Sequence, residues 1–416
     1  MKKHKKLITV TAIILALLIV FGVIFGKRIY NYFTGYVTPK ITSQSLPIKA
    51  ELSKGNSCII DFYKERSGDK YIFARNPWDM QTYNGRVYIS SGDYSENSGD
   101  TPIYYYDLKS DSFDYLDIVY TEQAARFFVI NDELYTTATD PIAWGVGEYY
   151  KLNDSESGFD YYEVLPSNIH CYDMVEFDNK FFFCGSVESY ENYSMVQYID
   201  SENMPGNNFD NTKQIYLYKD SKQIDNNMCY RVYDMFEYKD KLYIYHYGWE
   251  TTTGLYCLNT EKMRFEYVGD EMSLDEVVKN STLNLDNESN MLIQRKFQYN
   301  EKMVFINGDL FYTDDLKNYK VASFGEGFEN YVPRDALEIE NQLYVLASKQ
   351  LENGKYTTSV FVTENLENYT EVLNFETQSY INSFEYIDKT FVFGEGGTSE
   401  NTNENCGMLY TFKLSK

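Results

Sequence analysis

A short phrase recurs along this 416-residue chain and constrains its fold more than any other feature. Its clearest copies are "WDMQTYNGRVYIS" (78–90), "YDMVEFDNKFFFC" (172–184) and "YDMFEYKDKLYIY" (233–245). In each copy an aromatic residue precedes Asp-Met, and a second aromatic residue stands four positions after the Asp. Turn-forming residues then lead into another apolar segment. Because a short turn joins two such segments, each copy predicts a β-hairpin.

Four further segments keep the same frame with other residues at its start, which brings the number of copies to seven. The copies begin 40 to 61 residues apart. A third apolar segment follows each hairpin, and usually a fourth. Four antiparallel strands repeated at this period are typical of a β-propeller, in which a ring of sheets buries the faces that one sheet leaves exposed. The copies begin at Asp79, Arg126, Asp173, Asp234, Arg295, Asp335 and Asn382.

The expected fold is therefore all-β, a seven-bladed β-propeller of four-stranded antiparallel blades. The composition agrees, because 42 Tyr and 27 Phe against 3 Trp favour pleated sheets, on which aromatic rings pack well. The last copy reaches only its third strand before Lys416. We expect a strand within residues 58–75 to complete the last blade and close the ring.

The N-terminal segment predicts one transmembrane helix before the propeller. Residues 1–6 form a basic leader, and the uncharged residues 7–26 match the length that spans a bilayer as a helix. We interpret 7–26 as a signal-anchor, 27–50 as a linker and 51–416 as the propeller. The basic leader favours a single-pass protein of the cell membrane with an extracytoplasmic propeller. A cleaved signal peptide is the alternative.

The charge of the chain excludes some partners. The formal net charge is −24, and it falls to −30 for residues 29–416 because the first 28 residues carry six Lys or Arg and no acid. A domain this acidic is repelled by nucleic acid and by anionic lipid surfaces. The expected partners are the membrane, through the N-terminal helix, and a glycan, peptide or protein ligand.

Two turns in the later part of the chain carry a family resemblance. The segments "LFYTDDLKNYKVASF" (310–324) and "VFVTENLENYTEVLNF" (360–375) share Thr-x-Asp/Asn-Leu-x-Asn-Tyr. This pattern resembles the Asp box, a turn of sialidase-like propellers. The Gly of that box is absent here, and Tyr stands in the place of its Trp. The resemblance covers these two turns and implies propeller architecture.

Strand direction sorts the loops between two faces of the predicted ring. The hairpin turns lie on one face, the turn face, and the longer and more variable connections lie on the opposite loop face. Because loops carry most binding residues, the loop face is the predicted binding surface. Exposed aromatic rings there would stack on a ligand, whereas the alternative is that they plug the channel or cover loop cores. The candidate ligand-binding residues are Trp78, Trp144, Tyr172, Arg231, Tyr233, His246 and Trp249.

The seven starting residues form a charged ring around the predicted channel. Each arginine of the ring has an acidic residue on both neighbouring copies. An unpaired buried charge is costly, whereas a paired one is tolerated. The favoured interpretation is therefore a structural salt-bridge ring in which Asp234 pairs with Arg295. The alternative is a polar pocket, to which Arg75, Arg231 and Arg334 would add an anion site.

The sequence predicts no cofactor and no metal site. His170 and His246 fall on the loop face of neighbouring copies, where a metal shared with Asp173 is one reading. The segment "DYSENSGD" (93–100) alternates oxygen-bearing side chains as calcium loops do. It lacks their full spacing and their closing bidentate Glu. Calcium is therefore kept as an alternative.

Three functions are compatible with these patterns. The leading one is a membrane-anchored extracytoplasmic propeller that binds a ligand or a protein through its loop face. The second is a cell-surface carbohydrate-active hydrolase of the sialidase or glycosidase type, for which Asp173 and Asp234 are the candidate carboxylates. The third is a structural scaffold of an envelope complex. The sequence contains neither a Ser-His-Asp arrangement nor a Gly-rich phosphate loop, which favours a binding module over an enzyme.

Overall fold

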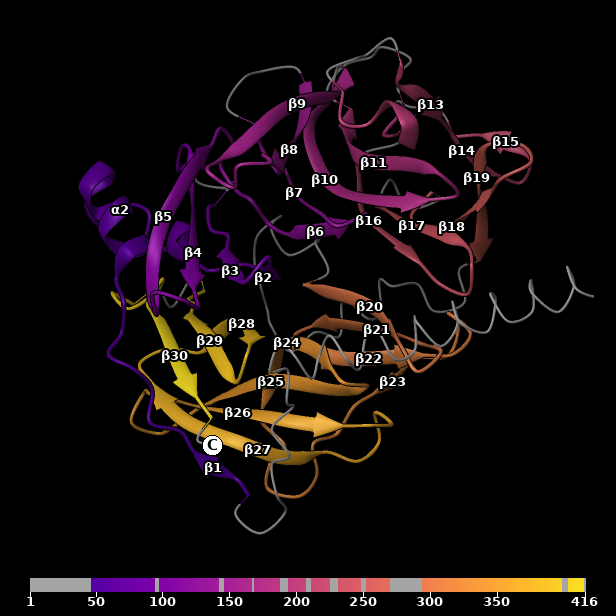
Figure 1. Cartoon of the computed structure of the whole chain (residues 1–416). Helices are drawn as coiled ribbons and strands as arrows, with labels where there is room; N and C mark the ends of the chain where they lie inside the picture. Colours follow the sequence, from indigo (N-terminus) through magenta and orange to yellow (C-terminus); the bar gives the residue numbers. More distant parts are fainter. Residues whose placement is uncertain are drawn as a thin grey trace, which may run out of the picture.

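The chain folds into an all-β propeller. Its sheets surround a common centre, and successive repeat copies follow one another around the ring (Figure 1). The structure is a computed structural model, and the residues that it describes are 46–93, 97–141, 146–166, 168–187, 194–206, 211–224, 231–247, 252–269, 294–398 and 403–414.

Three copies form separate four-stranded antiparallel sheets. The first contains β2 (Met80–Tyr83), β3 (Arg86–Ile89), β4 (Thr101–Asp107) and β5 (Ser112–Val119). The second contains β6 (Phe127–Ile130), β7 (Glu133–Thr137), β8 (Val146–Leu152) and β9 (Phe159–Pro166). The fifth contains β20 (Arg295–Tyr299), β21 (Lys302–Asn307), β22 (Asp309–Thr313) and β23 (Lys320–Val321).

The last two copies form sheets of five and three strands. The sixth copy contributes β24 (Val332–Ile339), β25 (Gln342–Gln350), β26 (Tyr356–Thr363) and β27 (Thr370–Thr377). The fifth strand of that sheet is β1 (Ile48–Lys49), which pairs in parallel with β27 and comes from the range expected to be a linker. The seventh copy contributes β28 (Ile381–Ile387), β29 (Thr390–Glu395) and β30 (Leu409–Lys413).

The third and fourth copies share one ten-stranded sheet. The third copy supplies β10 (Asn168–Phe177), β11 (Lys180–Val187), β12 (Val196–Asp200) and β13 (Lys213–Ile215). The fourth supplies β16 (Arg231–Glu237), β17 (Leu242–Tyr247), β18 (Gly254–Asn259) and β19 (Arg264–Gly269). The remaining strands are β14 (Leu217–Lys219) and β15 (Lys222–Gln223).

The number of separate sheets differs from the expected seven. The described residues form six hydrogen-bonded sheets, because Ser186 of β11 pairs with Arg231 of β16 and joins two copies. One backbone pairing at the loop-face ends of these strands is enough to merge sheets that the sequence repeat separates.

The hairpin turns explain why the seven phrases are recognisable in the sequence. Both central residues of each turn have positive φ, for example Asn84 at 47° and Gly85 at 81°. Type I′ turns require this conformation, and Asn, Asp and Gly adopt it most readily. The other six pairs are 131–132, 178–179, 239–240, 300–301, 340–341 and 388–389.

The register of the seventh copy is one residue away from the expected one. Ile387 and Thr390 flank its turn, so the ring position, four residues before Ile387, is Ser383 and not Asn382. Asn382 lies at an irregularity between paired residues Ile381 and Ser383. It is one residue closer to the loop face than the ring position. The sequence misassigned it because Tyr386 and Ile387 are both apolar and either one fits the repeat.

The same irregularity occurs in three other copies. The extra residue of the β-bulge directly precedes the ring aspartate, and it is Tyr172, Tyr233 or Arg334. A bulge re-aims the side chain that it carries. A collar of irregular positions therefore lies on the loop-face side of the ring.

The segment expected to close the ring is helical. Residues 58–75 contain α2 (Cys58–Ser67) and the short 3-10 helix η1 (Phe73–Arg75), so the prediction of a strand there is wrong. Ile59, Ile60 and Tyr63 are all buried. Their spacing is that of one helical face, and this is the signal that the strand interpretation overlooked.

Residues just before this helix take the outer position of the last sheet. Asn56 forms an antiparallel bridge with Leu409 of β30, and the Ser53 N–H donates to the Thr411 carbonyl at 2.9 Å. An N-terminal segment therefore does close the last blade, at residues 53–56.

The two turns that resemble Asp boxes have the same hydrogen bonds. In the first, Asp315 accepts bonds from the backbone of Lys317 and Asn318, both at 2.8 Å. In the second, Asn365 accepts the equivalent pair, both at 2.9 Å. Asp and Asn are interchangeable here because only the side-chain oxygen is used.

The expected membrane anchor, residues 7–26, lies outside the described residues. Among the residues that the structure does describe, no helix combines the length and the apolar character needed to cross a bilayer.

Candidate functional site

Three aspartates of the ring each join their own innermost strand to that of the next copy. In every case a carboxylate oxygen accepts the backbone N–H that follows the ring position of the neighbouring copy. The bonds run from Phe127 N to Asp79 Oδ2 at 2.6 Å, from Met235 N to Asp173 Oδ2 at 2.7 Å and from Phe384 N to Asp335 Oδ2 at 3.0 Å. Hydrogen bonds to a carboxylate are stronger than neutral ones. This contact explains why Asp recurs at the start of the repeat.

Two basic side chains neutralise one half of the ring. The Arg126 guanidinium lies 2.9 Å from Asp234 Oδ1 and 3.5 Å from Asp173 Oδ2. The Lys296 ammonium contacts both carboxylates as well, at 2.7 Å from Asp234 Oδ1. Asp173 and Asp234 are 1% and 0% exposed, so desolvation makes these pairs obligatory.

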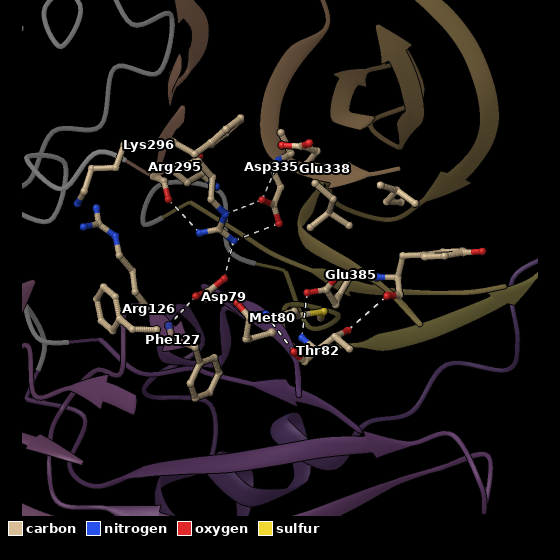
Figure 2. Close-up of a pocket in the computed structure, with 18 of the residues that line it drawn as sticks. Asp79, Met80, Thr82, Arg126, Phe127, Arg295, Lys296, Asp335, Glu338 and Glu385 are labelled. Atoms are coloured by element: carbon tan, nitrogen blue, oxygen red, sulfur yellow. Dashed lines mark hydrogen bonds and ion pairs between the residues drawn. The ribbon is translucent and has the colours of Figure 1, made fainter. Parts of the chain in front are cut away.

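Arg295 neutralises the other half. Its Nε and Nη2 donate to the two oxygens of Asp335, at 2.5 and 3.1 Å, and Nη2 also lies 2.9 Å from Asp79 Oδ1 (Figure 2). Burial lowers the pKa of Arg295, but the carboxylates of Asp335 and Asp79 outweigh it and raise that pKa overall. We call the seven residues of both halves the charged cluster: Asp79, Arg126, Asp173, Asp234, Arg295, Lys296 and Asp335.

The expected pairing of Asp234 with Arg295 is wrong. Asp234 pairs with Arg126 and Lys296, while Arg295 reaches Asp79, which begins the first copy. The prediction paired each residue with its neighbours in repeat order. Each arginine pairs with the aspartate of the next copy, Asp173 or Asp335. Each also reaches an aspartate farther around the ring, Asp234 or Asp79, and repeat order carries no information about those longer contacts.

Lys296 is the member of the charged cluster that sequence reasoning missed. It directly follows a ring position, where strand alternation would turn the side chain away from the channel. No other copy has a basic residue there. An unmatched lysine next to a ring with more acids than arginines is the only signal that the sequence offers.

A cavity of about 710 Å³ lies against the charged cluster. Asp79, Arg126, Arg295, Lys296 and Asp335 line its inner end. Its walls also include residues at the turn ends of the innermost strands, which lie on the turn face. The apolar part of the lining is Met80, Phe127, Phe128, Phe297, Ala336, Leu337 and Ile339, and the exposed residues at the turn end include Gln298, Glu338, Glu340 and Asp388.

Glu385 is a third buried acid in the lining of this cavity, beside Asp79 and Asp335 (Figure 2). Burial raises its pKa to about 8, although hydrogen bonds from the Tyr386 and Thr82 backbone oppose the rise. Burial also raises the pKa of Asp335, against the lowering effect of Arg295. The cavity therefore presents a carboxyl group that retains its proton at neutral pH, beside carboxylates that are held as ion pairs.

The aromatic candidates of the loop face are less exposed than expected. Tyr172 and Tyr233 are 0% and 2% exposed, and their rings lie 4.6 Å apart. Trp78 is half-buried and donates from Nε1 to the Gly92 carbonyl at 2.6 Å. The expectation of an exposed stacking surface is therefore wrong for the two tyrosines, which pack beside the channel. Trp144 and Trp249 lie outside the described residues.

The two histidines are buried and each bonds to a backbone carbonyl. Nδ1 of His170 lies 2.7 Å from the Thr139 carbonyl, and Nδ1 of His246 lies 3.0 Å from the Thr252 carbonyl. Burial lowers both pKa values to about 4. Among the described residues no group of three His, Cys, Asp or Glu side chains is arranged to hold a metal. Part of the candidate calcium loop, 94–96, lies outside those residues.

The three arginines expected at one rim have different surroundings. Arg75 is fully buried and pairs with Asp69 at 3.0 Å. Arg231 donates to the Tyr233 hydroxyl at 3.2 Å. Arg334 is 6% exposed, and its guanidinium carbon lies 3.8 Å from the centre of the Tyr380 ring. These contacts do not unite the three side chains into one anion site.

No protein-family model matches the chain, and no curated protein matches it either. Among solved structures it is similar to BamB from Moraxella catarrhalis, with 9% identity, a TM-score of 0.37 and coverage of 81% of this chain and 84% of that one. It is also similar to the β-propeller domain of the Trilobed protease from Pyrococcus furiosus, with 9% identity, a TM-score of 0.42 and coverage of 89% and 97%. The assignment of this chain to the β-propellers rests on its own sheets.

Proposed function

We propose that this chain is a membrane-anchored, extracytoplasmic binding module whose ligand enters the central cavity. Counted by sequence repeat rather than by hydrogen-bonded sheet, the proposed propeller has seven blades. The proposed membrane anchor is the 7–26 segment. The proposed ligand is a glycan, peptide or protein and not a nucleic acid. No cofactor is part of the proposal.

The observation that carries the proposal is the cavity. Its volume of about 710 Å³ falls in the range of small-molecule sites, about 300–1,000 Å³. Such sites combine an apolar lining with a few polar groups that fix orientation, and this cavity has both. Cluster residues form one end, and apolar side chains such as Leu337 and Phe297 line the walls. A ligand chain end or one sugar residue matches this size and chemistry.

We place the ligand in the cavity and let the loop face contribute secondary contacts. Arg231 is the proposed contact there, because it is only half-buried beside the collar. Several loops of that face, including 188–193, 248–251 and 270–293, lie outside the described residues. Trp144 and Trp249 therefore remain proposals from sequence.

A hydrolase that uses Asp173 and Asp234 is not favoured. Both carboxylates contact the same Lys296 ammonium and the same Arg126 guanidinium. Neither one lines the cavity. A catalytic acid or nucleophile must reach the substrate, and these two groups are occupied in holding the ring together.

Binding of the full chain, in a non-ionic detergent, to glycan and peptide arrays tests the proposal. The cavity-filling variant Leu337→Trp should lose the signal. Val321→Trp is the matched control, because Val321 is exposed on β23 and does not line the cavity. Binding that survives in Leu337→Trp would contradict the cavity as the site. The absence of any bound glycan or peptide would instead favour a structural scaffold.

A further inference from the structure

One buried arginine of the propeller is charged and has no anionic partner among the described residues. Arg334 is 6% exposed. Among the described residues it forms neither an ion pair nor a hydrogen bond, and its Nε is enclosed without an acceptor. In contrast, each basic residue of the charged cluster, Arg126, Arg295 and Lys296, has at least one carboxylate within 4.0 Å. The lack of a partner sets Arg334 apart.

The neighbours of Arg334 do not compensate its charge. The guanidinium stacks on the Tyr380 ring at 3.8 Å, and the Tyr356 ring packs against Tyr380 at 5.9 Å. Burial lowers the pKa of Arg334, and only the phenols of Tyr380 and Tyr356 act in the opposite direction. A cation–π contact is worth less than the desolvation of an unpaired charge. Within the described residues, the positive charge of Arg334 therefore lacks a compensating anion.

A β-bulge sets the direction of the Arg334 side chain. Arg334 is the extra residue of the bulge in β24, between the paired residues Pro333 and Asp335. Asp335 belongs to the charged cluster, whereas Arg334 does not line the cavity. The collar position of Arg334 therefore directs it away from the carboxylates that neutralise Arg295.

We propose that Arg334 and Tyr380 form a carboxylate-binding site on the loop-face side of the ring. The planar guanidinium donates two parallel hydrogen bonds to a carboxylate, and its Nη1 and Nη2 are not among the enclosed atoms. A single positive charge matches a singly charged carboxylate. A phosphate dianion would need a second unpaired cation, and the chain around it is acidic, with a net charge of −24.

The site deepens the proposed binding function and rests on it, because it supplies an anchor for one charged group of the ligand. Two sources of a carboxylate suit an extracytoplasmic propeller. One is an acidic sugar, and the other is the carboxyl group of a peptide. The Tyr380 ring, on which the Arg334 guanidinium stacks, is compatible with either kind of ligand.

The test measures thermal unfolding of the full chain in a non-ionic detergent with increasing concentrations of one probe. The probes are D-glucuronate and N-acetylglycine, with methyl β-D-glucopyranoside and N-acetylglycinamide as uncharged analogues and inorganic phosphate as the dianion. We expect at least one carboxylate, and neither uncharged analogue, to raise the unfolding temperature. Glucuronate alone would identify an acidic sugar, and N-acetylglycine alone a peptide carboxyl group.

Variants assign the effect to this side chain. Arg334→Met should weaken the response to the active carboxylate at least tenfold in concentration. Arg334→Lys should keep part of it, because the charge remains and the planar fork is lost. The matched control is Arg86→Met, since Arg86 is already paired with Asp107 at 3.3 Å, and it should respond as the unmodified chain does.

Several outcomes would overturn the inference. They are no stabilisation by either carboxylate, a stronger effect of phosphate, an equal effect of the uncharged analogues, or an unchanged response in Arg334→Met. If Arg334→Met does not fold, an unchanged response in Arg334→Lys together with an unchanged response in Tyr380→Leu has the same meaning. Leu337→Trp separates the two proposals, because it should abolish array binding and leave the carboxylate response intact.

Discussion

Two buried arginines on neighbouring innermost strands have opposite surroundings. Arg295, in β20, donates to both oxygens of Asp335 and also reaches Asp79. Arg334, in β24, lies on the face of Tyr380, and within the part of the chain that the structure describes no carboxylate pairs with it. The pKa of Arg295 is raised and that of Arg334 is lowered. Burial alone therefore does not give an arginine a structural role. A paired carboxylate distinguishes Arg295, which stabilises the fold, from Arg334, for which we propose a role in binding a ligand.

Removing the paired arginine should have the largest effect. We expect Arg295→Met to lower the free energy of unfolding by about 3–5 kcal/mol, because it leaves buried carboxylates without their partner. Urea unfolding followed by circular dichroism measures the change. A loss below about 1 kcal/mol would show that Asp79 and Asp335 do not depend on Arg295.

Removing the shared lysine should have a smaller effect. Lys296→Met should cost about 2 kcal/mol, because Arg126 remains to neutralise Asp173 and Asp234. The same unfolding experiment measures it. A cost equal to that of Arg295→Met would show that Arg126 contributes little to this half of the charged cluster.

A pH titration should sharpen the comparison further. The folded pKa of Glu385 is about 8, above its ordinary value of 4.5. The folded chain therefore keeps a proton that the unfolded chain has released. Stability should be full below about pH 4.5 and fall as the pH rises from there to about 8, by roughly 1.4 kcal/mol per pH unit for this group.

Glu385→Gln isolates this contribution, because the amide does not titrate. Its stability should decline less with pH over the same window, whatever its absolute stability. Glu122, Glu148 and Glu395, whose pKa values burial raises to about 7, add slopes of the same sign. His170 and His246, whose pKa values burial lowers from 6.5 to about 4, add slopes of the opposite sign. An identical slope in Glu385→Gln and in the unmodified chain would contradict the assigned pKa.

The repeat made most of the fold predictable. Asp79, Asp173, Asp234 and Asp335 stand at one register, and the turns that follow have positive φ at both central residues, which favours Asn, Asp and Gly. These preferences depend on residues that are close together in the sequence. The failures have equally local causes. The expected ring position fell on Asn382 instead of Ser383 because two apolar residues fit the frame. The strand interpretation of residues 58–67 overlooked the helical spacing of Ile59, Ile60 and Tyr63.

The site was less predictable, because its contacts join residues distant in sequence. Arg295 and Asp79 are separated by most of the chain and meet only after the ring closes. Lys296 reaches the charged cluster from a regular strand position at which alternation would turn its side chain away from the channel. The bulge that isolates Arg334 leaves no residue pattern of its own, since Tyr172, Tyr233 and Asn382 occupy the same position in other copies.

The most direct test of the account compares Arg334→Met with Arg295→Met by urea unfolding in the absence of ligand. Replacing an unpaired buried charge with an apolar side chain of similar length should leave the free energy of unfolding unchanged within about 0.5 kcal/mol, or raise it. Arg295→Met should lower the free energy of unfolding by about 3–5 kcal/mol. If Arg334→Met is as destabilising as Arg295→Met, Arg334 supports the fold and the distinction between the two arginines is wrong.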